Sequence, residues 1–132
     1  MNLSLLFFLP VVAFIAWMFW RSRPEIKPDA LRDALKSGRA VLVDVRESSE
    51  WASGTVRTAA LLPLSDLRGA RRQWGAFLDQ HRHRQLLLYC QSGARSASAA
   101  AQLRREGFDA RNAGSIAFLD RVNEPVQPQR RA

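Results

Sequence analysis

The chain has 132 residues and a formal net charge of +8, with 20 Lys and Arg against 12 Asp and Glu. Hydrophobic residues make up 47% of the sequence and aromatic residues 9%, which fits a globular core and excludes collagen-like, low-complexity and disordered classes. A single cysteine excludes an intramolecular disulfide and argues against a cysteine-based metal site. All charged side chains follow position 20, so an uncharged front end precedes one domain-sized remainder.

The front end is an apolar segment, residues 3–20, which reads LSLLFFLPVVAFIAWMFW. At about 1.5 Å per helical residue, a helix of this length spans about 27 Å, close to the hydrocarbon thickness of a bilayer. Trp17 and Trp20 stand near its end, where amphipathic rings favour the membrane interface. The sequence therefore predicts that residues 1–20 form a transmembrane helix in contact with the lipid bilayer.

Two other interpretations of this segment compete with a membrane anchor. A cleavable signal peptide would carry basic residues before the apolar run and small residues at its end. Here the run follows Met1-Asn2 and ends in bulky side chains. A buried helix of a soluble core fits poorly, because the segment is apolar on every side and the following domain has its own core pattern.

The charges that follow the apolar segment predict its orientation. Arg21, Arg23 and Lys27 come soon after the run, and no basic side chain precedes it. By the positive-inside rule, the following domain faces the cytoplasm, at the inner membrane if the source is bacterial. A lone cysteine, which suits a reducing compartment, agrees with that side.

The remainder divides into a charged, proline-containing linker over 21–28, one domain over 29–122 and a polar, flexible tail over 123–132. The segments with strand character are Ile26, 40–45, 59–62, 86–89 and 108–112. The segments with helix character are 28–37, 48–53 with Ser48 as its cap, 65–83, 96–106 and 115–122. Strands that alternate with helices predict an α/β domain with a central, mainly parallel, five-stranded sheet flanked by helices.

A cysteine stands where the strand at 86–89 ends and a helix begins. Cys90 is followed by Gln91-Ser92-Gly93-Ala94-Arg95. Ligands of parallel α/β sheets collect at the carboxyl ends of strands, and the glycine permits a loop that turns several N–H groups toward one point. The helix N-terminus and the arginine add positive potential, which lowers a thiol pKa. We therefore expect a nucleophilic thiolate rather than a small buried core residue.

Two stretches of the chain resemble the rhodanese-like sulfurtransferases. VLVDVRESSEWASGTV, residues 41–56, is similar to the family's strand and loop with an Asp-x-Arg pattern. LLLYCQSGARSASAAAQLRREGFDARNAGSIAFL, residues 86–119, is similar to the family's active-site strand, loop and helix. The resemblance runs in order over about residues 25–120 and implies a rhodanese-like fold for the domain.

The resemblance also implies a role for each residue of the cysteine loop. By resemblance, Cys90 is the nucleophile that forms a persulfide, and residues 91–95 form the loop that cradles an anion. These loop residues are Gln91, Ser92, Gly93, Ala94 and Arg95, the last being the charged closing residue. Asp44, Arg46 and Ser96 are the residues expected to support the loop. Neither a metal nor an organic cofactor is required.

The length of the loop favours sulfur chemistry over phosphorus chemistry. Cysteine phosphatases use a C-x5-R loop, whose extra residue admits a tetrahedral phosphate, whereas Cys90 to Arg95 is C-x4-R. Within the family that the chain resembles, the shorter loops go with sulfur transfer and the longer loops with phosphate or arsenate.

Two other features of the sequence do not predict a functional site. His81 and His83 are two residues apart, so they do not share a helix face, and no Cys or acid cluster accompanies them as further metal ligands. The arginines are spread along the chain without interleaved aromatic residues, so the positive charge does not predict binding to nucleic acid. Proximity to an anionic membrane leaflet accounts for the charge.

The sequence therefore predicts a membrane-anchored sulfurtransferase. In this hypothesis Cys90 takes sulfur from a small sulfur-containing anion, such as thiosulfate, and passes it to cyanide or to a thiol on a small molecule or a protein. One alternative is a non-catalytic module of the same fold that recruits or presents a partner, such as a membrane protein, at the bilayer. Another is an anchored adaptor whose persulfide is a signal.

Overall fold

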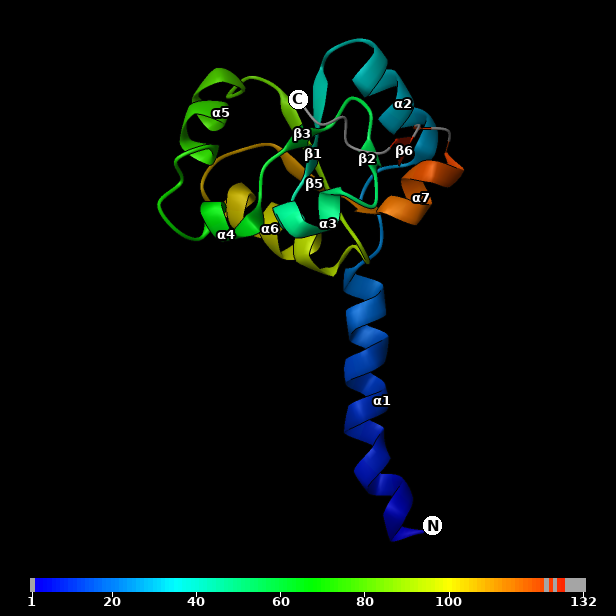
Figure 1. Cartoon of the computed structure of the whole chain (residues 1–132). Helices are drawn as coiled ribbons and strands as arrows, with labels where there is room; N and C mark the ends of the chain where they lie inside the picture. Colours follow the sequence, from blue (N-terminus) through cyan, green and yellow to red (C-terminus); the bar gives the residue numbers. More distant parts are fainter. Residues whose placement is uncertain (1, 123, 125, 128–132) are drawn as a thin grey trace.

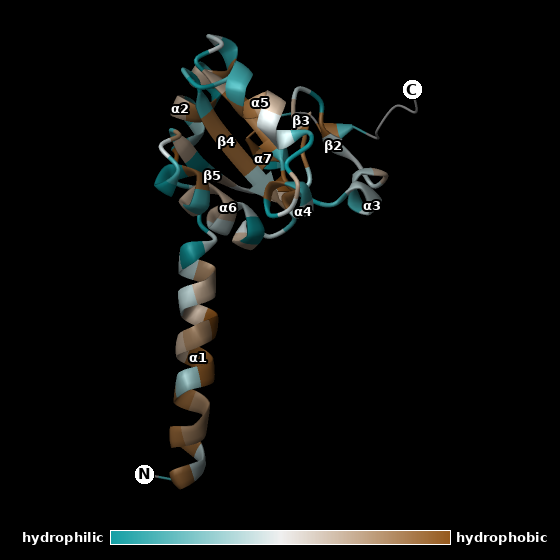
Figure 2. Ribbon diagram, turned by 90° about the vertical axis from the view of Figure 1, so that its left-hand side faces the viewer, coloured by the Kyte–Doolittle hydropathy of each residue, from teal (hydrophilic) through white to brown (hydrophobic). Residues whose placement is uncertain are grey.

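In the computed structural model, a long helix extends from an α/β domain (Figure 1). The structure describes residues 2–122, 124, 126 and 127. The helix, α1 (Leu3–Arg21), buries none of its residues, and apolar residues predominate along it (Figure 2). Within the described residues, α1 is the one helix that is long and apolar enough to cross a membrane.

The domain is built on a four-stranded parallel sheet with the strand order β3-β1-β4-β5. The strands are β1 (Ala40–Asp44), β3 (Ala60–Leu61), β4 (Gln85–Cys90) and β5 (Ala110–Ser115). The central pair is in register from Ala40 opposite Gln85 to Asp44 opposite Tyr89. Because the strands are parallel, they end at the same edge of the sheet, and Cys90 lies at that edge.

Helices cover both faces of the sheet, as the continuous apolar strands require. Along β4, Leu86, Leu88 and Cys90 belong to one core cluster, which also contains residues of α4, α5 and α6. Leu87 and Tyr89 belong to the opposite cluster, which contains residues of α2 and α7. The helices are α2 (Pro28–Lys36), α4 (Leu64–Leu67), α5 (Trp74–Gln80), α6 (Ala94–Arg105) and α7 (Ile116–Arg121). The thiol therefore lies on the face that α6 covers.

A small antiparallel sheet joins β2 (Thr55–Val56) to β6 (Val126–Gln127). The buried Tyr89 hydroxyl accepts a hydrogen bond from the Val56 N–H at 3.0 Å and so connects β2 to the main sheet. The sequence predicted a flexible tail over 123–132. Two residues of that tail form β6 instead, and the others except Glu124 lie outside the described residues.

The predicted α/β class and the parallel sheet flanked by helices are confirmed, but the main sheet formed by the described residues has four strands and not five. Ile26, the predicted fifth, forms no strand. The prolines on either side of it, Pro24 and Pro28, lack the N–H group that a ladder of hydrogen bonds needs. One backbone bond remains, from the Glu25 N–H to the Asn112 carbonyl oxygen at 2.7 Å.

The segment 65–83, predicted to be largely helical, contains two separate short helices, α4 and α5. Arg71 lies between them with a φ of 52°, in the left-handed region that a right-handed helix does not contain. The Asp66 carboxylate accepts hydrogen bonds from the backbone N–H groups of Arg72, Gln73 and Trp74. These bonds satisfy the donors at the start of α5 and favour two short helices over one long helix.

Candidate active site

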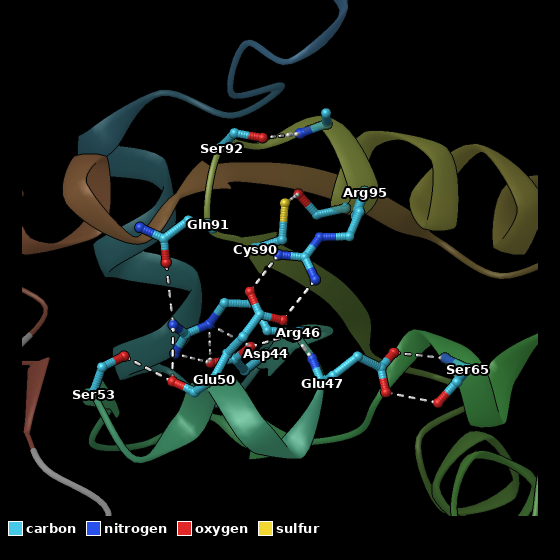
Figure 3. A network of polar contacts seen from close by, with 12 residues as sticks. Asp44, Arg46, Glu47, Glu50, Ser53, Ser65, Cys90, Gln91, Ser92 and Arg95 are labelled. Carbon is cyan, nitrogen blue, oxygen red and sulfur yellow. Dashed lines mark hydrogen bonds and ion pairs between the residues drawn. The ribbon is translucent and has the colours of Figure 1, made fainter.

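Cys90 is buried between the end of β4 and the start of α6, and the loop after it curls around its sulfur (Figure 3). The Gly93 N–H donates a hydrogen bond to Sγ at 3.1 Å. Gly93 has a φ of 90°, which glycine adopts without the steric cost that other residues meet. The Ser96 hydroxyl, on the first turns of α6, lies 3.4 Å from Sγ. The loop and the helix therefore direct polar hydrogens at one sulfur atom.

Opposing influences act on the pKa of the Cys90 thiol. Burial, the largest of them, raises this pKa because the thiolate loses hydration. Hydrogen bonds from the Ser96 hydroxyl and from the backbone N–H groups of Ser96, Ser92 and Gly93 lower it. Together these bonds outweigh burial, so the pKa lies below its ordinary value. A lowered pKa enlarges the thiolate fraction at neutral pH, and the thiolate is the nucleophilic form.

Arg95 is paired with a carboxylate and is not a free cation. Its Nη1 and Nη2 atoms each donate to one oxygen of Glu50, both at 2.7 Å. The hydrogen bonds from Arg95 are the main reason why the pKa of Glu50 is lowered to about 2, and the same pair raises the pKa of Arg95. Both groups are therefore charged at neutral pH. The pair connects α6 to α3 (Ser48–Trp51) on one side of the cysteine loop.

Glu50 was not identified from the sequence as a site residue, although the neighbouring residues contain a pattern that indicates where its side chain lies. Glu47 and Glu50 form a capping box at the start of α3, in which each side chain accepts a hydrogen bond from the backbone of the other residue. The N-terminal cap is therefore Glu47, and the predicted cap, Ser48, is wrong. The box orients the Glu50 carboxylate, which is then available to Arg95.

A second ion pair, between Asp44 and Arg46, is fully buried at the end of β1. Arg46 Nη2 lies 2.9 Å from Asp44 Oδ2, and Nε lies 3.1 Å from Oδ1. Arg46 also donates to the Gly54 carbonyl oxygen at 2.6 Å and to Gln91 Oε1 at 3.3 Å. One guanidinium therefore connects the end of β1, the turn before β2 and the cysteine loop.

Asn112, on β5, is another buried polar residue at the loop that the sequence did not single out. The Ser96 hydroxyl donates to Asn112 Oδ1 at 2.7 Å, and Asn112 Nδ2 donates to the Gly93 carbonyl oxygen at 3.1 Å. The Ser96 hydroxyl has one hydrogen, so donation to Asn112 Oδ1 competes with its donation to Sγ at 3.4 Å. The available signal was an asparagine at the end of the strand predicted over 108–112, because an amide that becomes buried there needs hydrogen-bond partners.

The structure brings the predicted site residues together at one edge of the sheet. Asp44, Arg46 and Gln91 lie on one side of the thiol, Ser96 lies in α6, and Ala94 begins that helix. Ser92 is exposed, and its hydroxyl accepts from the Ala94 N–H at 3.4 Å. A pocket next to the loop is lined by Arg46, Ser53, Gly54, Gln91, Ile116, Ala117, Asp120 and Val126.

The polar groups at the thiol suit an anion. Each of the two site arginines is matched by a carboxylate, so the positive potential at Sγ comes largely from the loop N–H groups and the N-terminal end of α6. Within the described residues, no group of three or more His, Cys, Asp or Glu side chains could hold a metal ion. The arrangement can stabilise a thiolate and the negative charge of a small ligand that reacts with it.

Fold and site together define an α/β domain that presents a polarised cysteine at the carboxyl edge of a parallel sheet. The family model described as Rhodanese-like domain matches residues 27–117, and the chain belongs to this family.

Proteins with a similar sequence include sulfurtransferases. The human thiosulfate:glutathione sulfurtransferase is 34% identical over 97 residues, which cover 64% of this chain and 81% of that protein. The probable adenylyltransferase/sulfurtransferase MoeZ of Mycobacterium tuberculosis is 40% identical over 84 residues, which cover 63% of this chain and 20% of that protein. The match thus spans only a fifth of MoeZ. Together the family and these relatives support sulfur transfer as the general chemistry of the chain.

Solved structures agree on the fold. The human single-domain sulfurtransferase TSTD1 aligns with a TM-score of 0.60 and 34% identity, over 74% of this chain and 96% of that one. A rhodanese-related protein from Thermoplasma volcanium aligns with a TM-score of 0.65 and 25% identity, over 81% of this chain and 100% of that one.

Glu50→Gln is expected to destabilise the protein only at pH values where the native carboxylate is ionised. In the folded state the pKa of Glu50 is lowered from 4.5 to about 2, so the ion pair contributes its full stability above pH 4.5 and loses it as the pH falls toward 2. Thermal unfolding from pH 7 to pH 2 should show a difference in Tm that narrows below pH 4.5. Asp33→Asn, which changes an exposed carboxylate on α2, is the control. A difference that stays constant over this range contradicts the prediction.

Proposed function

We propose that the protein is a membrane-anchored sulfurtransferase in which Cys90 carries the transferred sulfur as a persulfide. The observation that carries the proposal is the buried thiol with the Gly93 N–H at 3.1 Å and a lowered pKa. A module that only recruits a partner has no need of such a thiol. The sulfurtransferase relatives support the same general chemistry.

In the first step, the Cys90 thiolate attacks the outer sulfur of thiosulfate or of a related sulfane donor. A sulfur–sulfur bond forms to Cys90, the bond between the two donor sulfurs breaks, and its electron pair leaves with sulfite. The loop N–H groups and the N-terminal end of α6 stabilise the leaving anion and the persulfide. The name of the human relative, which specifies thiosulfate, supports this donor class.

In the second step, the thiolate of an acceptor attacks the outer sulfur of the Cys90 persulfide. The bond between the two sulfurs of the persulfide breaks, and its electron pair returns to Cys90 as the thiolate. The acceptor leaves as a persulfide, or as thiocyanate when cyanide takes its place. A thiol acceptor agrees with the glutathione in the name of the human relative. Protein thiols belong to the same chemical class.

We infer that α1 anchors this domain in a membrane, with the domain on the cytoplasmic side. The helix has 19 residues, and none of them is buried against the domain. The Arg21 guanidinium lies 5.2 Å from the centre of a Trp17 ring, a cation–π contact that suits the boundary between lipid and water. The basic residues that follow α1 support the orientation.

Cys90→Ser tests the persulfide directly. After incubation of the full-length protein with thiosulfate, mass spectrometry should find one added sulfur on the wild type and none on the variant. Because the chain has one cysteine, the added sulfur has one expected site. Transfer to cyanide or glutathione should be lost with the thiol. Equal turnover by both proteins would exclude Cys90 as the nucleophile, and no turnover by either protein would favour the non-catalytic module.

Arg95 interacts with the Cys90 sulfur as well as with Glu50, so Arg95→Ala is expected to raise the pKa of the Cys90 thiol. It should also slow sulfur transfer about tenfold to a hundredfold, the effect of losing one charge-assisted hydrogen bond. The variant also leaves the Glu50 carboxylate without its cation near the thiolate. In the double variant Arg95→Ala, Glu50→Gln, the pKa of the Cys90 thiol should therefore fall part of the way back toward its wild-type value. Arg95→Lys should restore part of the rate, because an ammonium group lacks the planar fork.

The measurements for Arg95 are turnover and the pH dependence of Cys90 alkylation. Arg105→Ala, an exposed residue on the same helix, is the control and should match the wild type. If Arg95→Ala changes neither quantity, the loop N–H groups bind the anion without help from Arg95.

Carbonate washing of membranes tests the anchor. The full-length protein should stay in the membrane fraction with residues 1–20 still attached, as judged by the intact mass. A reporter fused after residue 132 should be active in the form that works in the cytoplasm. Release of a shortened chain would indicate a signal peptide, and a reporter active only outside the cytoplasm would reverse the orientation.

A further inference from the structure

The segment that leads out of α1 lies directly against the cysteine loop. We call this segment, residues 22–25, the strap. A Cβ atom added to Gly93 would clash with the Ser22 carbonyl oxygen. A Cβ atom added to Gly114, at the end of β5, would lie 2.8 Å from Pro24 Cγ. The backbone of the strap therefore lies against the backbone of the loop at Gly93, and the Pro24 ring lies against the backbone of β5 at Gly114.

The buried Asn112 side chain binds the strap and the loop at the same time. Its Nδ2 donates to the carbonyl oxygens of Ser22 at 3.2 Å, Arg23 at 3.1 Å and Gly93 at 3.1 Å. The two N–H bonds of one amide are thus shared among three acceptors from two chain segments. Its Oδ1 accepts from the Ser96 hydroxyl at 2.7 Å, so both ends of the amide are in use.

Glu25 fixes the far end of the strap. Its N–H donates to the Asn112 carbonyl oxygen at 2.7 Å, and its carboxylate accepts from the Asn112 N–H at 2.9 Å. Arg104 of α6 lies 3.2 Å from the same carboxylate. The strap is therefore bound to β5 and to α6, the strand and the helix that follow the cysteine loop in the chain.

We propose that Asn112 is a positioning residue through which the strap holds the cysteine loop in its anion-binding form. The carbonyl oxygen of Gly93 is bound by Asn112, and its N–H is bound by the Cys90 sulfur, so both polar groups of this residue are oriented. Glycine has wide conformational freedom, and without these bonds the loop N–H groups have alternatives to pointing at the sulfur. That the loop geometry matters for catalysis rests on the proposed sulfur transfer at Cys90.

The strap lies outside the residues that the family model matches, which begin at residue 27. It also begins one residue after the end of α1, and Figure 1 shows α1 joining the domain close to the cysteine loop. The order of the loop therefore depends on a segment that is continuous with the proposed membrane anchor. In this way the structure connects the reactive thiol to the end of α1.

The test compares Asn112→Ala, Glu25→Ala and Glu25→Gln in the full-length chain in lipid nanodiscs. Two quantities are measured: the pH midpoint of Cys90 alkylation, and hydrogen exchange over residues 22–25 and 91–94. Asn112→Ala should reduce the thiolate fraction at pH 7 about threefold to tenfold, the range for one lost hydrogen bond, and should speed exchange in both segments. Glu25→Ala should also reduce the thiolate fraction and speed exchange in both segments, but by smaller amounts. Glu25→Gln keeps an oxygen acceptor for the Asn112 N–H and should stay near the wild type.

The proposal is overturned if Glu25→Ala speeds exchange over 22–25 while residues 91–94 and the alkylation midpoint stay as in the wild type. It is also overturned if Asn112→Ala shifts the midpoint without changing exchange over 22–25, because Asn112 then acts through Ser96 alone. If Asn112→Ala does not fold, the comparison of Glu25→Ala with Glu25→Gln tests the proposal by the same two measurements. Alkylation and exchange need no sulfur transfer, so failure to load sulfur from thiosulfate contradicts the proposed function and leaves this test intact.

Discussion

The buried ion pair of Asp44 and Arg46 is the interaction on which the arrangement of the site depends. A buried guanidinium needs a hydrogen-bond acceptor for each of its N–H groups. The acceptors of Arg46 come from β1, from the turn at Gly54 and from Gln91 of the cysteine loop. Removal of one member of such a pair costs about 3–5 kcal/mol, because the other charge stays buried. Three chain segments are therefore held at one point, next to the thiol.

Charge balance around this point explains how a thiol can be activated in a buried place. Arg46 and Arg95 are both paired with carboxylates, so the lowering of the Cys90 pKa depends mainly on directed hydrogen bonds and not on an excess of positive charge. Directed bonds act only in one geometry of the loop. This requirement gives a physical reason for the two supports of the loop, the Arg95–Glu50 pair on one side and Asn112 with the strap on the other.

Much of the fold and the centre of the site could be predicted from the sequence, because the signals for them are local. Continuous apolar runs at 40–45 and 86–89 are strands of a buried parallel sheet, and the glycine after Cys90 marks a loop that turns its N–H groups inward. The position of the break within the helical segment predicted over 65–83 could not be predicted, because it depends on the left-handed backbone of Arg71 and on the carboxylate of Asp66.

The sequence by itself determined the α/β class, the apolar helix α1 and the position of the cysteine between a strand and a helix, since each follows from neighbouring residues. Only the tertiary structure showed that Glu50 and Asn112 also hold the cysteine loop in place. Glu50 reaches Arg95 from 45 residues away, and Asn112 reaches Ser22 from 90 residues away. Such pairings depend on which strands are neighbours and in what register, and on the path of the chain leaving α1. These are properties of the packed chain, because a hydrogen bond needs its two atoms within about 3 Å whatever their separation in sequence.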